Sequence, residues 1–438
     1  MTGTKTTWTN WAGNQQSQPV EVVHPRDVDA VALAVKEALS AGRRLKVAGS
    51  GHSFTAAAVT DGTLLVLDQL VRVLAVDSAS GLVTVQAGMT LHQLNRVLAG
   101  VGLALSNLGD IDRQTVAGAI ATGTHGTGLR LGGLATQVRG MQLVTGSGDV
   151  VECSGTERAS LFDAARVGLG ALGVVTTVTL QCEPAFVLRA QEEAMDIDRV
   201  LADLDELAQD NDHFEFFWFP HTDAAMVKRN NRLPAGAEQE PLRPVRSWVE
   251  EELLANVAFG AVCQLGLRRP SLIPALNRRS VRLMGSRTYT GASHEVFSSP
   301  RRVRFVEMEY AVPREAVRPA FDAVRGVIER EGLRVSFPVE VRVTKADDIP
   351  LSTASDRDSA YLAIHMYRGE VDYERFFRAV EKELQGMAGR PHWGKLHYRS
   401  AEDLRPVYPR FDDFLAVRDD TDPGRVFTND YLERVLGP

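Results

Sequence analysis

The chain has 438 residues, of which 44% are hydrophobic and 24% are charged, a composition that can fill more than one globular core. Its net charge of −7 comes from 49 basic and 56 acidic side chains that are well mixed, so no basic stripe indicates nucleic acid or an anionic membrane as a partner. A small, uncharged substrate is compatible with this balance, and membrane association is not expected.

The cysteines argue against a disulfide framework or a zinc site, because Cys153, Cys182 and Cys263 are far apart and include no C-x-x-C spacing. We expect core thiols in a reducing compartment and no bound metal. The first residues lack a positive cluster followed by an apolar run, so no secretory signal is predicted and the cytoplasm is the expected location. The longest apolar segment, residues 253–267, is shorter than the ~18–20 residues that span a bilayer. It is predicted to form a buried helix or part of an association surface.

The first predicted elements are a helix over residues 27–41 and a strand over residues 45–48, followed by the turn Gly49-Ser50-Gly51-His52-Ser53. Two glycines after a strand let backbone N–H groups approach a phosphate. An imidazole in such a turn is placed to bond to a flavin, so the segment predicts FAD with His52 as its anchor. A plain glycine-rich loop with a surface histidine fits this segment equally well. A nicotinamide-type fingerprint is disfavoured, because Phe54 stands where a third glycine is needed.

Further short strands are predicted over residues 63–67, 73–76 and 82–85, and Thr90 is expected to cap the helix that follows. Two more segments, residues 115–128 and 168–175, consist mostly of small residues. Their backbone groups and threonine hydroxyls can approach a bulky polar ligand closely. A flexible loop is also rich in small residues, but it seldom contains Ile and Val within the run. Three such segments within an α+β region indicate a long, extended ligand.

The pattern changes after about residue 186. A strand dense in aromatic residues is predicted over residues 213–219, and strands with a period of two are predicted over 304–310, 339–343 and 360–367. With an amphipathic helix over 314–332, these elements indicate a second α+β domain.

Glu340 and Arg342 share one face of a predicted strand. Such a pair is usually a solvated surface pair. The apolar neighbours of this strand instead favour burial, where two charges must bind each other or a polar substrate.

Lys395 lies close to His392 in a turn bounded by proline and glycine, and could present a positive charge to a ring that becomes anionic. A surface loop whose Trp393 fills a core gap is the alternative.

Six motifs taken together resemble the aldonolactone oxidases and dehydrogenases of the vanillyl-alcohol oxidase flavoprotein superfamily, with alditol oxidase as a close relative. They are WTNWAG at 8–13, GSGHS at 49–53, AG to THGTG between 117 and 128, FPVEVR at 337–342, HWGK at 392–395 and FTND at 427–430. The resemblance implies an α+β fold: a two-subdomain FAD-binding domain over residues 1–185, an α+β cap domain over 186–395 above the flavin, and a C-terminal segment, 396–438, that returns to the FAD domain.

The resemblance also implies roles for single residues. His52 is implied to bond covalently to the flavin. The other implied FAD contacts are Gly49, Ser50, Gly51, Ser53, Gly118, Thr122, Thr124, Gly126, Val175 and His392. The implied catalytic groups are Glu340, Arg342 and Lys395. Asp110 and Tyr367 stand where alditol oxidase has a serine and a threonine that contact the substrate, and this departure favours a lactone over a simple polyol.

The implied reaction is oxidation of a secondary alcohol of an aldonolactone of the L-gulono-1,4-lactone type by hydride transfer to N5 of FAD. The product is a 2-keto-lactone that enolises to an ascorbate-type enediol. Electrons then pass to O2 or to an electron-acceptor protein or dye, and Gly109 is the residue expected to admit oxygen. An alditol oxidase that converts xylitol or sorbitol to an aldose and H2O2 is the alternative. A flavin-carrying protein without a substrate is an alternative from another class, but the charged strand at Glu340 speaks against it.

Overall fold

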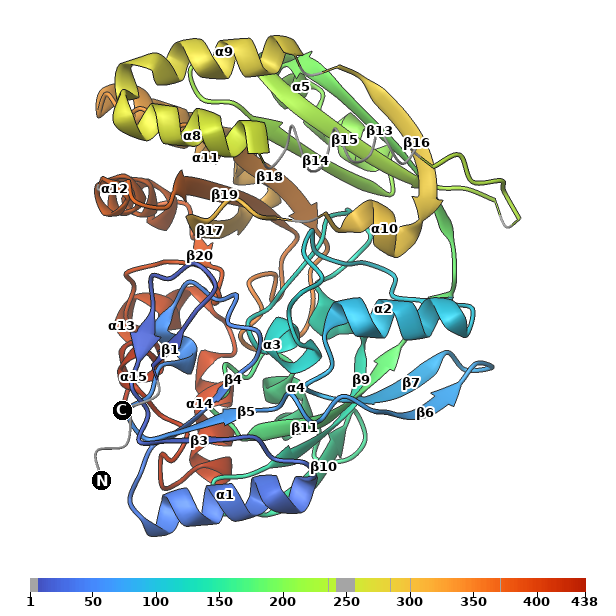
Figure 1. Ribbon diagram of the computed structural model, residues 1–438, viewed down its shortest axis with the longest axis vertical. Coiled ribbons are helices and arrows are strands. Elements are labelled where there is room, and N and C mark those ends of the chain that lie inside the picture. The colour runs from blue at the N-terminus through green and yellow to red at the C-terminus, as the bar shows by residue number, and fades with distance from the viewer. Residues whose placement is uncertain (1–6, 235, 242–256, 284, 300, 371) are drawn as a thin grey trace.

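The structure is a computed structural model that describes residues 7–438 except 235, 242–256, 284, 300 and 371. In Figure 1, the N-terminal sheets and the last helices of the chain lie in the lower half, and a large sheet with its own helices lies above them. None of the helices in the described part of the chain has the length and apolar character needed to cross a bilayer.

The first subdomain is a small parallel sheet, which follows from the β-α-β order of its elements. Asp27 begins its helix, because its side chain accepts a hydrogen bond of 2.8 Å from the backbone N–H of Ala30. The strand order is β3-β5-β4. The bounds are β3 (Glu21–Val23), α1 (Val28–Ser40), β4 (Leu45–Ala48), η1 (Ala56–Ala58) and β5 (Thr63–Val66), with the short pair β1 (Trp8–Thr9) and β2 (Gln16–Ser17) beside them. The glycine-rich turn therefore starts at the carboxyl end of β4.

The second subdomain is an antiparallel sheet in the order β10-β9-β11-β7-β6. Every second residue of β11 is buried, so one face of the sheet packs on the core. Thr90 forms a capping box with Gln93 at the start of α2, as predicted. The bounds are β6 (Val73–Asp77), β7 (Leu82–Gln86), α2 (Leu91–Gly100), β8 (Leu103–Ala104), α3 (Val116–Ala121), η2 (Leu134–Gln137), β9 (Val138–Val144), β10 (Val150–Ser154), α4 (Ala159–Ala165), β11 (Val174–Gln181) and β12 (Glu183–Pro184).

The cap is an antiparallel sheet in the order β16-β13-β15-β14-β18-β19-β17-β20. Its strands are β13 (Val187–Asp196), β14 (His213–Trp218), β15 (Ala224–Arg232), β16 (Arg287–Ala292), β17 (Phe305–Pro313), β18 (Val339–Thr344), β19 (Ser359–Tyr367) and β20 (Arg390–Pro391). Its helices are α5 (Ile197–Ala202), α6 (Leu204–Gln209), α8 (Phe259–Arg268), η4 (Pro270–Leu272), α9 (Ile273–Leu283), α10 (Ser293–Phe297), η5 (Arg314–Ala316), α11 (Val317–Arg330) and α12 (Tyr373–Gln385).

The two faces of the cap sheet differ in chemistry. The apolar residues of β18, such as Val341, share a core with Phe321 of α11 and Phe376 of α12. Glu340 and Arg342 alternate with these residues and therefore occupy the opposite face. All six residues of β18 are buried, so this second face is charged and still shielded from water.

The C-terminal segment packs against the N-terminal region through α13 (Ala401–Leu404), η6 (Arg405–Val407), α14 (Phe411–Thr421) and α15 (Asp430–Leu436). Asn429 caps α15 by accepting from the N–H of Leu432 at 2.9 Å. Its Nδ2 donates to the carbonyls of Ala56 and Val59, both at 2.9 Å. The last helix is thus tied to the segment that follows the glycine-rich turn.

The predicted elements are largely confirmed, but the apolar segment 253–267 is only partly explained. Residues 253–256 lie outside the described residues. The rest lies mainly in α8, where Cys263 and Gly266 are buried while Leu265 and Leu267 are 42% and 40% exposed. The prediction of a buried helix is therefore wrong for this part, because only a narrow stripe of α8 faces the cap. The three cysteines are free and buried, as expected.

Candidate functional site

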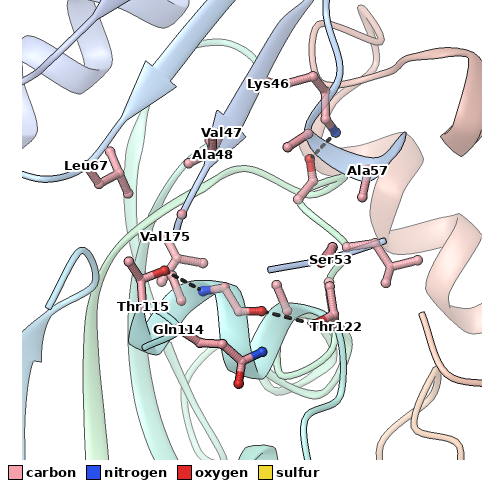
Figure 2. A pocket seen from close by; sticks show the side chains of 18 of the residues that line it. Lys46, Val47, Ala48, Ser53, Ala57, Leu67, Gln114, Thr115, Thr122 and Val175 are labelled. Carbon is pink, nitrogen blue, oxygen red and sulfur yellow. Dashed lines mark hydrogen bonds between the residues drawn. The ribbon is translucent and has the colours of Figure 1, made fainter. Parts of the chain in front are cut away.

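The three glycine-rich segments line one cavity. It contains about 1080 Å³ of empty space, counted out to its open mouth. Figure 2 shows Ser53 from the first segment, Thr115 and Thr122 from the second and Val175 from the third around this space. Three segments far apart in sequence thus line a single cavity.

Two glycines let the walls of this cavity approach each other. A Cβ on Gly49 would lie 2.4 Å from Oγ1 of Thr115, and a Cβ on Gly118 would lie 2.9 Å from the same atom. The hydroxyl of Thr115 also accepts from the N–H of Gly118 at 3.1 Å, which begins α3. Gly51 has φ +69°, a conformation that side chains rarely adopt. A Cβ therefore has no room where the turn meets α3, and the backbone itself forms the wall.

The structure divides the predicted cofactor contacts into two groups. The residues that line the cavity are Gly49, Ser50, Gly51, His52, Ser53, Gly118, Thr122 and Val175. Thr124, Gly126 and His392 are not among the lining residues. Thr124 contacts the cavity indirectly, because its hydroxyl accepts from Nε2 of the lining residue Gln114 at 3.1 Å.

Lys46 also lines the cavity and is absent from the sequence-based prediction. Its fully buried ammonium donates to the carbonyl oxygens of Phe427 at 2.8 Å and Gly170 at 3.2 Å. Burial, with a smaller contribution from Arg418, lowers its pKa to about 7. Lys46 therefore joins β4, the third glycine-rich segment and the C-terminal segment at one end of the site.

His52 lies where the cavity meets the cap. Its ring stacks on Trp11, with centroids 5.6 Å apart and planes at 30°. Burial lowers the pKa of His52 to about 4, with further contributions from the positive charges of Lys395 and Arg113. The imidazole is therefore neutral at pH 7, which leaves a ring nitrogen available to form a bond.

Arg342 is the centre of the charged face of the cap. Its Nε donates to Glu215 Oε2 at 2.8 Å, it forms an ion pair with Glu340, and its Nη2 lies 3.7 Å from Asp110 Oδ2. Asp110 also accepts from Arg301 Nη2 at 2.7 Å. The structure therefore brings three of the predicted site residues together, across two domains.

The three carboxyl groups around Arg342 have different proton affinities. Burial raises the pKa of Glu340 well above its ordinary value, despite Arg342. Burial also opposes ionisation of Asp110 and Glu215, but Arg342 and a second cation, Arg301 or Lys228, outweigh it and hold both pKa values low. Glu340 therefore takes up a proton more readily than Asp110 or Glu215 do.

Lys395 forms an ion pair with Glu307 on β17. Glu307 lies opposite His365 in the β17–β19 register, and His365 Nε2 is 3.5 Å from its Oε1. Burial opposes the charge on Lys395, but Glu307 and Glu309 outweigh it and raise its pKa. The sequence-based prediction lacks these two glutamates, although their alternation with apolar residues along residues 304–310 could have indicated them.

His125, Glu309 and His392 form a buried cluster whose possible ligand atoms lie within 4.8 Å of one another. Nε2 of His125 is 3.3 Å from Glu309, and its Nδ1 is 2.9 Å from the carbonyl oxygen of Gly126. Both ring nitrogens of His125 therefore face acceptors. His392 Nδ1 accepts from the N–H of Gly394 at 3.1 Å, which puts the proton of the neutral ring on Nε2. These hydrogen bonds favour a carboxylate held between two donors over a metal site, which needs free lone pairs.

Tyr367 and Gly109 are not among the residues that line the cavity. Tyr367 is half-buried at the end of β19, opposite Phe305, on the same side of the strand as His365. A Cβ on Gly109 would lie 3.2 Å from the carbonyl oxygen of His125 and 3.3 Å from Cγ2 of Thr124. Gly109 thus lies where even a methyl group would be crowded.

Comparison with protein families gives two matches. Residues 178–435 match the family model described as D-arabinono-1,4-lactone oxidase, and residues 19–154 match the FAD binding domain.

Three curated relatives match nearly the whole chain. The L-gulono-1,4-lactone dehydrogenase of Mycobacterium tuberculosis is 44% identical over 98% of this chain and 99% of its own. The L-gulonolactone oxidase of Bos taurus is 36% identical over 98% and 97%, and the alditol oxidase of a Streptomyces species is 33% identical over 98% of both chains. Among solved structures, a solvent-stable cholesterol oxidase superposes with a TM-score of 0.83 at 21% identity, covering 99% of this chain and 98% of its own. At that identity it supports the fold alone.

Replacing Arg342 with Met should leave its carboxyl partners without their shared cation. Breaking a buried ion pair on one side costs about 3–5 kcal/mol, and we expect a loss of this size in the free energy of unfolding at pH 7.5. Because Arg342 depresses the pKa values of Asp110 and Glu215, its contribution is complete above their ordinary values, 3.8 and 4.5, and is lost as the pH falls through the folded-state values. The difference between wild type and variant should therefore shrink between pH 7.5 and pH 4.

Urea denaturation at the two pH values measures this difference. Arg342→Lys keeps the charge and should lose less stability than Arg342→Met. Equal losses for Lys and Met would show that shape, and not charge, holds the site together.

Proposed function

Since the chain belongs to the aldonolactone oxidase and dehydrogenase family of FAD-linked oxidoreductases that act on CH–OH donors, we propose that it oxidises a secondary alcohol of an aldonolactone of the L-gulono-1,4-lactone type. The matches confirm the family resemblance, the FAD cofactor and the α+β fold with its flavoprotein architecture. The observation that carries the proposal is the position of Lys395, whose ammonium lies 5.4 Å from the centroid of the Phe54 ring, next to the glycine-rich turn, and forms an ion pair with Glu307 in the cap.

The cavity suits FAD, because the Gly49 and Gly118 walls have no room for side chains and present backbone to an extended ligand. When bound, FAD supplies the hydride acceptor at N5. His52 would anchor the flavin, and a covalent bond to it belongs to the proposal. Lys395 would place its ammonium beside the ring and stabilise negative charge that develops there.

The charged face of the cap supplies complementary groups for a lactone. Burial raises the pKa of Glu340, so its carboxyl group can take part in proton exchange with a lactone or hydroxyl oxygen, and Arg342 can bind a second oxygen of the substrate. The hydroxyl proton of the substrate would leave into the Glu340/Arg342/Lys395 network, in which Glu307 is the carboxylate nearest the ammonium. Such groups bind an uncharged, polar molecule without adding an unpaired charge to the buried face.

Asp110 supports a lactone over a polyol. Its carboxylate is occupied by Arg301 and Arg342, so it cannot offer a free hydroxyl as the serine of an alditol oxidase would. The higher identity to the L-gulono-1,4-lactone enzymes than to alditol oxidase points the same way. A cytoplasmic enzyme without a nucleic-acid partner, passing electrons to O2 or an acceptor protein or dye, completes the proposal.

The substrate class is tested by mixing the enzyme anaerobically with L-gulono-1,4-lactone or xylitol and following loss of the yellow flavin absorbance. The lactone should bleach the flavin at least ~10-fold faster at equal concentration, because the cap binds a carbonyl oxygen that xylitol lacks. Faster bleaching by xylitol would favour the alditol oxidase. No bleaching by any sugar alcohol or lactone would favour a flavin-carrying protein without a substrate.

Lys395→Met should bind FAD but slow reduction of the flavin by the lactone ~10²–10³-fold, the usual loss when one charge-stabilising donor is removed. Stopped-flow absorbance measures this rate, and the flavin-to-protein absorbance ratio checks binding. Lys382→Met, on an exposed position of α12, serves as the control and should react at the wild-type rate. A wild-type rate in Lys395→Met would remove this residue from the mechanism.

His52→Ala tests the covalent link. After precipitation in acid, flavin should stay with the wild-type polypeptide and appear entirely in the supernatant of the variant. His24→Ala changes a half-exposed histidine and should retain the flavin. Release of flavin from the wild type would exclude the bond.

A further inference from the structure

Trp11 lies against the anchoring histidine of the cofactor site and also reaches solvent. Its ring stacks on His52 and meets the rings of Phe54 and Phe305 edge-on at 6.5 Å and 5.4 Å. Trp11 and His52 are both half-buried, so neither is sealed inside the protein. The His52 end of the cofactor site therefore lies close to the surface of the protein at Trp11.

The surface around Trp11, called the Trp11 rim below, is basic. Arg304 Nη1 donates to the carbonyl oxygen of Trp11 at 2.7 Å, and the Arg368 guanidinium lies 2.7 Å from where a Cβ on Gly13 would stand. Both arginines are exposed, and neither pairs with a carboxylate of any residue that the structure describes. Arg113, which is 65% exposed and lies 3.4 Å from Asp112, also lowers the pKa of His52.

The positive charge continues over the neighbouring helices α8 and α9. Cδ2 of Leu267 comes within 3.8 Å of a Cβ position at Gly369, which directly follows Arg368. Residues 257–286 contain five arginines and no Asp or Glu. They are Arg268, Arg269, Arg278, Arg279 and Arg282, all exposed and without an ion pair within the described ranges. Acidic and basic residues are well mixed over the chain as a whole, but residues 257–286 carry positive charge alone. The overall charge balance did not predict this local excess.

We propose that this basic surface around Trp11 docks an acidic redox protein that takes electrons from the cofactor site. The inference rests on the proposed function. Oxidation of one lactone alcohol to a ketone releases two electrons and two protons, so two molecules of a one-electron acceptor are reduced in each turnover and the protons leave to solvent. Electron tunnelling falls steeply with distance, and the Trp11 rim is the surface that adjoins His52. A local positive field guides an acidic partner to this place, whereas oxygen or a small neutral dye needs no such field.

The probe is horse cytochrome c in two forms: native, which is basic, and fully succinylated, which is acidic with the same haem. Lactone-dependent haem reduction is followed anaerobically at low and high salt. The succinylated form should react at least ~10-fold faster at low salt, and this advantage should fall as salt screens the field. Arg304→Glu/Arg368→Glu should reverse the preference.

Two controls separate docking from the chemistry. Arg26→Glu/Arg96→Glu changes the same number of charges at exposed arginines of the FAD domain and should keep the preference for the acidic form. Flavin bleaching by the lactone, and turnover with a neutral quinone dye, should be unchanged in both double variants. Failure of bleaching in the wild type would refute the proposed function and not the docking surface.

Three results would overturn the proposal. They are equal or faster reduction of native cytochrome c, an unchanged preference in Arg304→Glu/Arg368→Glu despite normal bleaching, and reoxidation by oxygen alone with neither cytochrome reduced. Binding of wild type to anionic lipid vesicles, lost in the double variant, together with no cytochrome preference, would assign the surface to a membrane instead. Arg304→Gln/Arg368→Gln removes the two charges without reversing them and should give an intermediate preference. This variant tests the same surface if the Glu variant does not fold.

Discussion

The burial of Arg342 among three carboxyl groups is the constraint on which the site depends. Burying a guanidinium and several carboxyl groups costs free energy unless each group has a partner. The structure must therefore keep β14 paired with β18 in one register and keep Asp110 close to Arg342. Such a group is weak evidence for stability, because an apolar cluster would pack as well. The proposed function gives this group a role, because it offers a ligand carboxyl groups of different proton affinity and a planar cation in a place shielded from water.

The cofactor cavity and the charged face meet at two residues from opposite ends of the chain. His52 follows β4 of the parallel sheet, and Lys395 follows β20, the last strand of the cap. The neutral imidazole and the ammonium are close enough for one to change the pKa of the other. The C-terminal segment also supports this site, because hydrogen bonds of Asn429 and Lys46 connect it to the segments that line the cavity. The FAD domain therefore depends on residues that the chain adds only at its end.

The two proposals together place the two halves of the reaction in different parts of the molecule. The groups proposed to bind the lactone lie on the buried face of the cap, whereas Trp11 and its arginines lie at the surface. A substrate in the cap and an acceptor outside would therefore not compete for one entrance. The charge patterns agree with this division. Ion pairs neutralise charges on the buried face, whereas Arg304 and Arg368 pair with no carboxylate among the described residues.

Local patterns in the sequence determined the elements and the cofactor site. Three signals depend only on residues that are close in sequence: the helical period of residues 27–41, the capping threonine at position 90 and the glycine-rich segments. The structure has α1, α2 and the cavity walls where these signals predict them. The alternation of residues 339–343 likewise put Glu340 and Arg342 on one face. Tertiary structure alone decided the partners: Glu215, Glu307 and Arg301 reach the site through strand register and domain contact, which depend on residues distant in sequence. The burial of α8 could not be predicted for the same reason. Which of its apolar residues are buried depends on how the helix packs on the cap sheet, and this packing is not determined by residues close in sequence.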